Sequence, residues 1–301
     1  MSDNHFLEDA INRSGETNAD RAALAGMVAA AGTESAAAVT PEISDGSILN
    51  FALNLEYLEA EFYLRASGLT LPDELTTGTG TRGEVTGGRP VPFTSSVIRK
   101  IAAEIAEDER AHVVFLRNAL GSAAVARPAI SLDQSFTAAA RAAGLIMPGE
   151  TFDAYANDLN FLFAAFLFED VGVTAFKGAA PFISNKTYLD AAAGLLATEA
   201  YHAGIVRTSL YNEGMIDDAV FTAVEKISNI RGAVDGVGSD DQSIGDAETL
   251  NLVPNDPEGR AFGRTPEHIL NIVYLTGDRA TSGGFYPDGL NGDLRESAQT
   301  A

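Results

Sequence analysis

The sequence predicts an all-α protein whose centre is an antiparallel four-helix bundle. Apolar residues recur at steps of three and four along four long stretches, which is the pattern of helices that bury one face. Two of these stretches carry a Glu-x-x-His motif, at residues 109–112 and 199–202. Alanine contributes much of the 46% hydrophobic content, and alanine has the highest intrinsic helix propensity.

The first bundle helix is expected from about Ser47 to Ala66, with Ser44, Asp45 or Ser47 as its cap. A loop rich in Gly, Pro and Thr follows at 67–93. The residues at steps of three and four form a stripe on the face of this helix that is expected to point inward. The stripe contains one acidic residue among apolar and aromatic ones: Leu49, Ala52, Glu56, Ala60 and Tyr63.

The second helix is expected to begin near Thr94 or Ser95 and to end before Gly121. Residues 121–151 connect it to the third helix, and a short helix is expected within them at 134–143. This long connection fits a crossover between the second and third helices of a bundle, although the first connection is also long. The inward stripe of the second helix contains two titratable residues: Ala102, Ile105, Glu109, His112 and Leu116.

The third helix is expected over about 152–176, where a Lys-Gly pair and a later proline within 177–181 end it. Its inward stripe is Leu162, Ala165, Glu169, Gly172 and Phe176. The fourth helix is expected from about Asn185 to Tyr211. Its inward stripe is Leu195, Glu199, His202, Val206 and Leu210.

The chain continues well beyond the fourth helix. A fifth helix is expected at 216–230, a loop rich in Gly, Asp and Pro at 231–264, and a short helix at 265–275. The tail SGGFYPDGLNG reads as a string of turns, and its apolar residues are expected to pack back onto the body: Phe285, Tyr286 and Leu290.

Three parts are therefore expected along the chain. Residues 1–44 form an N-terminal extension, residues 45–212 form the bundle, and residues 213–301 form a C-terminal extension that packs on the bundle. The 301 residues suffice for one large domain with such extensions.

Six titratable residues lie on inward, apolar faces of the four helices, where a core residue is expected. A Glu and a His three residues apart lie on one face of a helix, so both can reach the same metal ion. Unpaired buried carboxylates are unfavourable, and bound cations would neutralise them. The sequence therefore predicts a two-metal centre with six ligands: Glu56, Glu109, His112, Glu169, Glu199 and His202. The alternative is that Glu109 and Glu199 lie at the edge of their stripes and pair with surface arginines.

The composition of this ligand set indicates which metals it would hold. Oxygen-rich sites with one imidazole per ion suit iron or manganese better than zinc or copper, so two iron or manganese ions are the expected cofactors. Two ions about 3.5–4 Å apart can bind oxygen, peroxide or hydroxide between them. No catalytic residue beyond the ligands and no organic cofactor is expected.

Five neighbours of the six residues have more than one interpretation. Glu59 is an alternative ligand, or more simply a residue beside the ligands or on the surface. Asp108 and Asp170 would orient a ligand histidine if they were inward, but a solvated helix face is favoured for both. Tyr63 and Tyr201 would donate to a metal-bound oxygen or would pack in the core.

Charge and composition exclude several classes of function. The formal net charge of -22 argues against nucleic-acid binding and against adhesion to anionic membranes. The sequence has no Cys, which excludes disulfides and thiolate metal sites. No stretch reaches the roughly 18 apolar residues of a membrane span, so no membrane helix is expected. Of four histidines, two lie in the motifs, and His268 at a helix start is expected to be structural.

The N-terminal extension leaves the cellular location open. Residues 20–38 combine a single arginine, a short apolar run and small-residue sites, similar to a degenerate export signal. The acidic residues before them are wrong for such a signal, and an alanine-rich helix is the favoured interpretation. The protein is therefore expected either in the cytoplasm or exported to the periplasm or outside the cell.

Several segments resemble the ferritin-like family of desiccation-related proteins, over about residues 44–294. The resemblance implies a ferritin-like antiparallel four-helix bundle with an N-terminal extension, long loops and a C-terminal extension of helix and turns. Relatives often carry an arginine pair near the N-terminus, whereas this chain has only Arg21 there. The matching segments are ILNFALNLEYLEAEFYLRA, VPFTSSVIRKIAAEIAEDERAHVVFLRNALG, FLFEDVGVTAFKGAAPFI, TEAYHAGIVRTSLY, RTPEHILNIVYLTG and GGFYPDGLNG.

The resemblance also implies roles for individual residues. Glu56 and Tyr63 match a superfamily pattern in which the first-helix ligand is followed seven residues later by an aromatic residue. Carried over by motif, Glu109 and Glu199 are bridging or terminal carboxylates. The two motif histidines, His112 and His202, are then the nitrogen ligands.

Two functions from different classes fit these expectations. The first is a di-metal oxidoreductase, catalase-like or ferroxidase-like, that acts on peroxide or oxygen species under stress. The second is a non-catalytic metal-binding or structural stress protein. The expected partners are a small-molecule oxidant or metal ions, and the expected assembly is a monomer or a small homo-oligomer rather than a storage cage.

Overall fold

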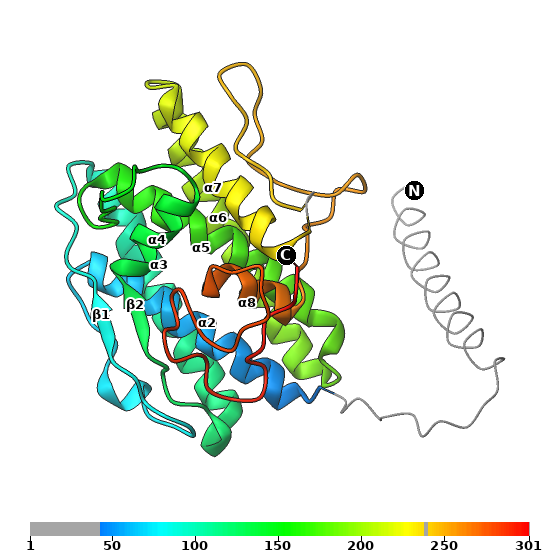
Figure 1. Cartoon of the computed structure of the whole chain (residues 1–301). Helices are drawn as coiled ribbons and strands as arrows, with labels where there is room; N and C mark the ends of the chain where they lie inside the picture. The colour runs from blue at the N-terminus through cyan, green and yellow to red at the C-terminus, as the bar shows by residue number, and fades with distance from the viewer. Residues whose placement is uncertain (1–42, 238–239, 301) are drawn as a thin grey trace, which may run out of the picture. The chain divides into compact units, whose positions relative to one another are not determined.

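The computed structural model describes residues 43–237 and 240–300. The chain divides into two units, Met1–Glu42 and Ile43–Ala301, and the expectations for the N-terminal extension fall almost entirely outside the described residues. Among the described residues of the second unit, helices predominate and the strands are short (Figure 1). The predicted all-α class is confirmed.

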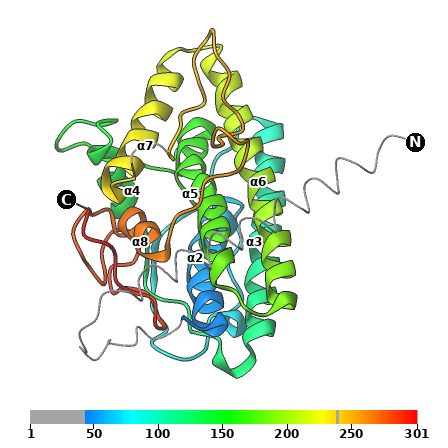
Figure 2. The same cartoon turned by 90° about the vertical axis from the view of Figure 1, so that its right-hand side faces the viewer.

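Four long helices form the bundle and lie side by side in Figure 2. They are α2 (Asp45–Ala66), α3 (Ser96–Leu120), α5 (Asp158–Ala179) and α6 (Lys186–Gly214). Helix α2 packs along α3, and α5 packs along α6. At one end of the bundle, the first halves of α2 and α6 meet the second halves of α3 and α5. Helices α3 and α5 therefore run in the same direction, and the long segment between them is the expected crossover.

Side-chain caps explain where these helices begin. The Oγ atoms of Ser44 and Ser95 accept hydrogen bonds from Ser47 N at 3.0 Å and from Ile98 N at 3.3 Å. Helix α5 begins at Asp158 rather than near residue 152 because Asn157 Oδ1 caps it, accepting from the main-chain N of residue 160 at 2.9 Å. The polar side chain satisfies an otherwise free backbone N–H, which fixes the helix start.

The predicted end of α5 at residue 176 was wrong. The helix continues through Gly178 to Ala179, and the following proline lies in the short helix η4 (Ala180–Phe182). A Cβ on Gly178 would lie only 1.8 Å from the carbonyl oxygen of Arg264. The glycine permits close approach of another backbone segment, so it does not act as a helix terminator here.

Helix α5 is also more apolar than expected. By length and composition, residues Asp158–Phe182 would be sufficient for a membrane span, contrary to the sequence-based expectation. However, 78% of the most apolar window is buried inside the protein. Apolarity on all sides is typical of a helix at the centre of a large core.

The two long connections of the bundle pair with each other, which was not predicted. Strand β1 (Val85–Gly87) runs parallel to β2 (Ile130–Leu132), with Val85 opposite Ile130. The short helices η2 (Asp73–Leu75) and η3 (Gly121–Ala123) lie in the same connections. Strands of three residues are too short to show the alternating pattern that identifies a strand in a sequence.

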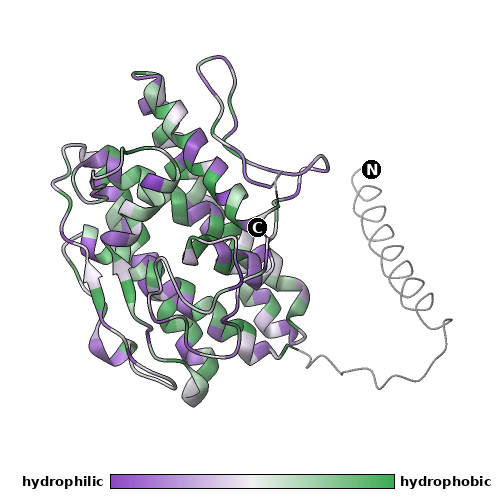
Figure 3. Ribbon diagram, viewed as in Figure 1, coloured by the Kyte–Doolittle hydropathy of each residue, from purple (hydrophilic) through white to green (hydrophobic). Residues whose placement is uncertain are grey.

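Three further helices and the tail cover the bundle: α4 (Gln134–Ala142), α7 (Ala219–Asp235) and α8 (Pro266–Tyr274). Phe285 and Tyr286 are buried, and the Tyr286 hydroxyl donates to Asn54 O of α2 at 2.8 Å. Most helices in Figure 3 carry both hydrophobic and hydrophilic residues, as expected when one face of each helix is buried.

Candidate metal centre

All six predicted ligand residues converge in the middle of the bundle. Each of the four helices contributes at least one, and every one is buried to 94% or more: Glu56 from α2, Glu109 and His112 from α3, Glu169 from α5, and Glu199 and His202 from α6. The alternative in which Glu109 and Glu199 pair with surface arginines does not occur, because both side chains are fully buried.

The six residues form two overlapping ligand sets. One is Glu56, Glu109, His112 and Glu199, and the other is Glu109, Glu169, Glu199 and His202. Within each set the ligand atoms lie within 4.8 Å of one another. Glu109 and Glu199 belong to both sets, so these two carboxylates would be available to both ions of a two-metal centre.

The residues fit two cations because most of their carboxylate oxygens have no hydrogen-bond partner. Both carboxylate oxygens of Glu109 and of Glu199, and one of Glu56 and of Glu169, are buried without a hydrogen bond. Buried polar atoms in folded proteins are almost always paired, and an orphaned carboxylate is costly. Four carboxylates would balance the charge of two divalent ions, so the set is matched in charge as well as in geometry.

Both histidines turn Nδ1 toward the carboxylates. His112 Nδ1 lies 3.2 Å from Glu56 Oε2, and His202 Nδ1 lies 3.0 Å from Glu109 Oε1. The other nitrogen of His202, Nε2, lies 3.1 Å from Asp108 Oδ2. A partner on the second nitrogen fixes the tautomer and orientation of a ligand histidine. The sequence favoured a solvated position for Asp108. Its side chain is partly exposed, but it also contacts His202 and can orient this histidine.

Burial and charge shift the pKa values of the cluster. Burial, followed by repulsion from neighbouring carboxylates, raises the pKa of Glu199, and burial likewise raises the pKa of Glu169. Burial alone would lower the pKa of His202, but its close contact with Glu109 and the charge of Glu169 raise the pKa to about 10. Without metal, the cluster therefore retains protons that metal ions would displace.

The metal-free protein should lose stability as the pH rises from about 6.5 through 10. The pKa of His202 is raised from 6.5 to about 10 on folding, so its stabilising contribution is complete below 6.5 and disappears as pH rises through the folded value. With metal bound, the histidines are already neutral ligands, and this loss should be absent. Thermal unfolding of chelator-treated and metal-loaded protein between pH 6 and pH 10 measures the difference; parallel curves would contradict a metal site here.

Glu59 is buried beside the six ligands. It is 5% exposed, and its Oε2 atom has no hydrogen-bond partner. Burial, followed by the charges of Glu199 and Glu109, raises its pKa well above the usual value. The sequence offered three interpretations of this residue, and the structure supports the one in which it lies next to the ligands.

Gly172 leaves the space into which two carboxylates extend. A Cβ at this position would lie 2.2 Å from Glu199 Oε2 and 3.3 Å from Glu59 Oε1. Glycine within a helix costs about 0.5–1 kcal/mol relative to alanine, so the close approach explains a residue that helix propensity disfavours.

Gly172→Ala should weaken metal binding by about tenfold or more, in the range seen when the supports of a ligand are altered. The new methyl group would displace the Glu199 carboxylate from the position shared by both ligand sets. Gly194→Ala is the matched control, since no atom lies within 4 Å of its added Cβ, and it should leave metal affinity unchanged. Competition with a chromophoric chelator measures both variants; equal affinities would refute the role of Gly172.

The structure places Tyr63, Tyr201 and His268 in three different surroundings. Tyr63 is fully buried and its hydroxyl donates to Glu169 Oε1, so it supports a ligand directly. Tyr201 is 75% exposed, and both interpretations proposed for it were wrong. His268 is half-buried in the first turn of α8, away from the six ligands.

Asp170 was expected on a solvated face, and it is instead buried in an ionic network. Its Oδ2 atom accepts from Arg207 at 2.7 Å and from Arg231 at 2.9 Å. Arg231 also contacts Asp241, and Arg264 pairs with Asp235 at 2.5 Å. The sequence reasoning missed these buried arginines. The available signal was the acidic pair 169–170 in an otherwise apolar helix, since a second buried carboxylate also needs a cationic partner.

Comparisons with known proteins agree with this geometry. A family profile described as a ferritin-like domain matches residues 44–212. The desiccation-related protein PCC13-62 of Craterostigma plantagineum is 32% identical in an alignment of 269 residues that covers 83% of this chain and 83% of that protein. The ferritin-like catalase Nec2 of Nesocodon mauritianus is 29% identical over 279 residues, covering 83% of this chain and 85% of that protein. No solved structure gives a significant match.

The family match covers more than half of the chain, and both relatives align along most of their length. The matched segment 44–212 includes all four bundle helices apart from the last two residues of α6, and therefore all six residues of the candidate centre. The resemblance inferred from the sequence is confirmed: the chain belongs to the ferritin-like family of desiccation-related proteins.

Proposed function

We propose that the protein is a di-metal redox enzyme that disproportionates hydrogen peroxide at the bundle centre. The observation that carries the proposal is the pair of overlapping ligand sets that share Glu109 and Glu199. The residues of the two sets would hold two ions, and such a pair would supply two-electron redox chemistry to a small substrate. The name of one relative, a ferritin-like catalase at 29% identity, favours peroxide as the substrate.

The reaction balances without another reactant. One peroxide loses two electrons and two protons and leaves as dioxygen, and the second gains them and leaves as two waters. Iron or manganese, which the ligand chemistry favours, would supply the storage of the two electrons. The chain supplies positions for protons near the ligands, at the Glu59 carboxyl and at the His202–Asp108 pair. Its buried surroundings exclude bulk water, which strengthens each electrostatic contact.

The test is peroxide decay with elemental analysis on the native protein. Loaded protein should release one dioxygen for every two peroxides consumed, and chelator-treated protein should release none. The metal content of active samples would identify iron or manganese. Loaded protein with full metal content and no dioxygen release would refute the proposal.

A second candidate is metal binding without turnover, in a stress-protective role. The name of the desiccation-related relative at 32% identity favours a role in drying, and the near-complete burial of the ligands restricts access to any substrate. Full metal content with increased thermal stability but no peroxide decay would be the result of this alternative.

We further propose that the protein is a monomer or small oligomer. The segments outside the four bundle helices, notably 67–95, 121–157 and 240–300, are long compared with the connections that a compact bundle needs. They cover bundle faces and ends that the subunits of a closed cage use for contact. Light scattering should therefore give the mass of one or a few 31.5 kDa chains; a particle of some twenty chains would refute this.

A further inference from the structure

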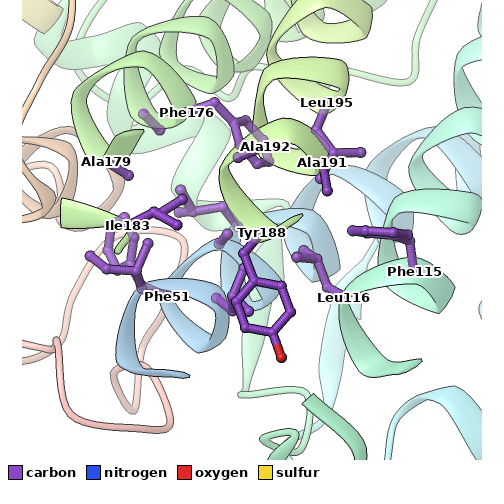
Figure 4. Close-up of a pocket in the computed structure, with 15 residues that line it drawn as sticks. Phe51, Phe115, Leu116, Phe176, Ala179, Ile183, Tyr188, Ala191, Ala192 and Leu195 are labelled. Atoms are coloured by element: carbon purple, nitrogen blue, oxygen red, sulfur yellow. The ribbon is translucent and has the colours of Figure 1, made fainter. Parts of the chain in front are cut away.

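An apolar pocket lies at the end of the bundle where α2 and α6 begin and α3 and α5 end (Figure 4). All four bundle helices contribute to its lining, and the same four helices carry the six candidate ligands. Its volume is about 20 Å³, which exceeds the roughly 10–15 Å³ that one water-sized molecule requires.

The pocket lies one helical turn from the ligands. Ala52 is four residues before Glu56, and Leu195 is four residues before Glu199. On α3, Leu116 is four residues after His112. Residues four apart lie on the same helix face, about 5–6 Å from each other. The lining side chains therefore form the layer directly below the carboxylates.

The other side of the pocket reaches the protein surface. Phe115 of α3 lines the pocket and is 41% exposed, and Tyr188 of α6 is half-buried. In Figure 4 the hydroxyl of Tyr188 lies at the far end of the ring from the labelled alanine and leucine residues of α6. Of the lining side chains, Phe115 is the exposed one, and we take Phe115 and Tyr188 as the mouth of the pocket.

The lining determines which molecules can enter. The lining residues, all within the described part of the chain, carry no charge, and Tyr188 is the one with a polar side-chain atom. Water and peroxide need two or more hydrogen-bond partners, and apolar cavities of this kind remain dry while accepting xenon or small apolar molecules. A metal ion would lose its hydration without replacement. The small molecule of this chemistry that a redox centre consumes or releases is dioxygen.

We propose that this pocket is the route by which dioxygen passes between solvent and the metal centre. The route presupposes the redox function proposed above, in which dioxygen is a product of peroxide disproportionation. Dioxygen, the apolar product, would then leave by a different path from the one by which peroxide enters. The polar reactant needs hydrogen-bonding groups, which the partly exposed Asp108 provides beside His202.

The first test uses xenon, which reports an apolar cavity without any catalysis. Crystals of the metal-free wild-type protein under xenon pressure should show xenon in the pocket. Ala192→Leu should remove it, because Ala192 is buried and lines the cavity, and the added methylenes would occupy its small volume. Ala193→Leu is the matched control, since Ala193 is exposed on the same helix. Absence of xenon from the wild-type pocket would overturn the proposal.

The second test measures the passage of dioxygen itself. Protein loaded anaerobically with iron(II) is mixed with dissolved dioxygen, and oxidation of the bound iron is followed by absorbance. Ala192→Leu should slow this reaction by about tenfold, equivalent to roughly 1.4 kcal/mol of added barrier, whereas Ala193→Leu should react like the wild type. Equal rates for Ala192→Leu and the wild type would show that dioxygen does not use the pocket.

These outcomes separate the route from the enzyme function. If wild-type protein fails to decompose peroxide but its iron(II) oxidation depends on Ala192, the proposed function is wrong and the route stands. If Ala192→Leu is destabilised by overpacking, Phe115→Ala replaces it as the second variant. Opening the mouth should then accelerate iron(II) oxidation, and an unchanged rate would count against the route.

Discussion

Glu109→Gln is expected to abolish binding of both metal ions. Glu109 is a member of both ligand sets, and its side chain contacts His112 at 3.5 Å and His202 at 3.0 Å. The amide keeps the volume of the carboxyl group but lacks the charge that two cations require. We expect metal affinity to fall by more than the roughly 10–100-fold that accompanies loss of an outer-shell partner, and peroxide turnover to fall with it.

Two further variants make the result specific. Glu56→Gln removes a ligand from one set only, so it should leave a single ion bound. Glu107 lies on the exposed face of the same helix and pairs with Arg110 at 2.5 Å. The Glu107→Gln variant should therefore bind metal like the wild type. Elemental analysis after dialysis gives the number of ions per chain. Two ions retained by Glu109→Gln would refute a bridging role.

Arg231→Met should lower the free energy of unfolding by about 3–5 kcal/mol, the cost of breaking a buried ion pair. Arg231 is 1% exposed and donates to Asp170 at 2.9 Å, to Asp241 at 2.6 Å and to the carbonyl of Phe166 at 2.6 Å. Methionine keeps an apolar stem but leaves buried acceptors without a donor. Urea unfolding monitored by circular dichroism measures the loss.

Arg260→Met is the matched control for this loss. Arg260 pairs with Asp256 at 2.8 Å, but its side chain is 69% exposed. An ion pair exposed to water contributes little to the free energy of unfolding, so the urea midpoint of Arg260→Met should stay close to that of the wild type. Equal midpoints for both arginine variants would mean that the buried network contributes little to stability.

The six candidate ligands could be predicted from the sequence because the pattern that identifies each of them lies within a single helix. A Glu and a His three residues apart must share a helix face, and a lone acidic residue such as Glu56 in an apolar stripe must be buried if the stripe is. Neither inference needs knowledge of another helix. Repetition of the pattern on two pairs of helices then made convergence the simplest interpretation.

Contacts between segments that are far apart in the sequence could not be predicted from the sequence. The pairing of Val85 with Ile130 joins two loops with no strand-like alternation. The partners of Asp170 come from α6 and α7, and only the folded chain brings them together. Gly178 illustrates the same limit, because a glycine near a proline indicates a helix end, whereas its function is contact with the backbone of Arg264.

The hydrogen bond from Tyr286 to Asn54 spans 232 positions of the chain, and this separation has a consequence for biosynthesis. All six candidate ligands lie at or before residue 202, so the last of them is synthesised before Tyr286, and the 84 positions from 202 to 286 take roughly 4–17 s at elongation rates of about 5–20 residues per second. The segment that covers α2 two residues from Glu56 is translated after all six ligands. During that interval metal ions can reach ligands that the finished protein encloses, so loading during translation would avoid the reopening that a completed chain requires.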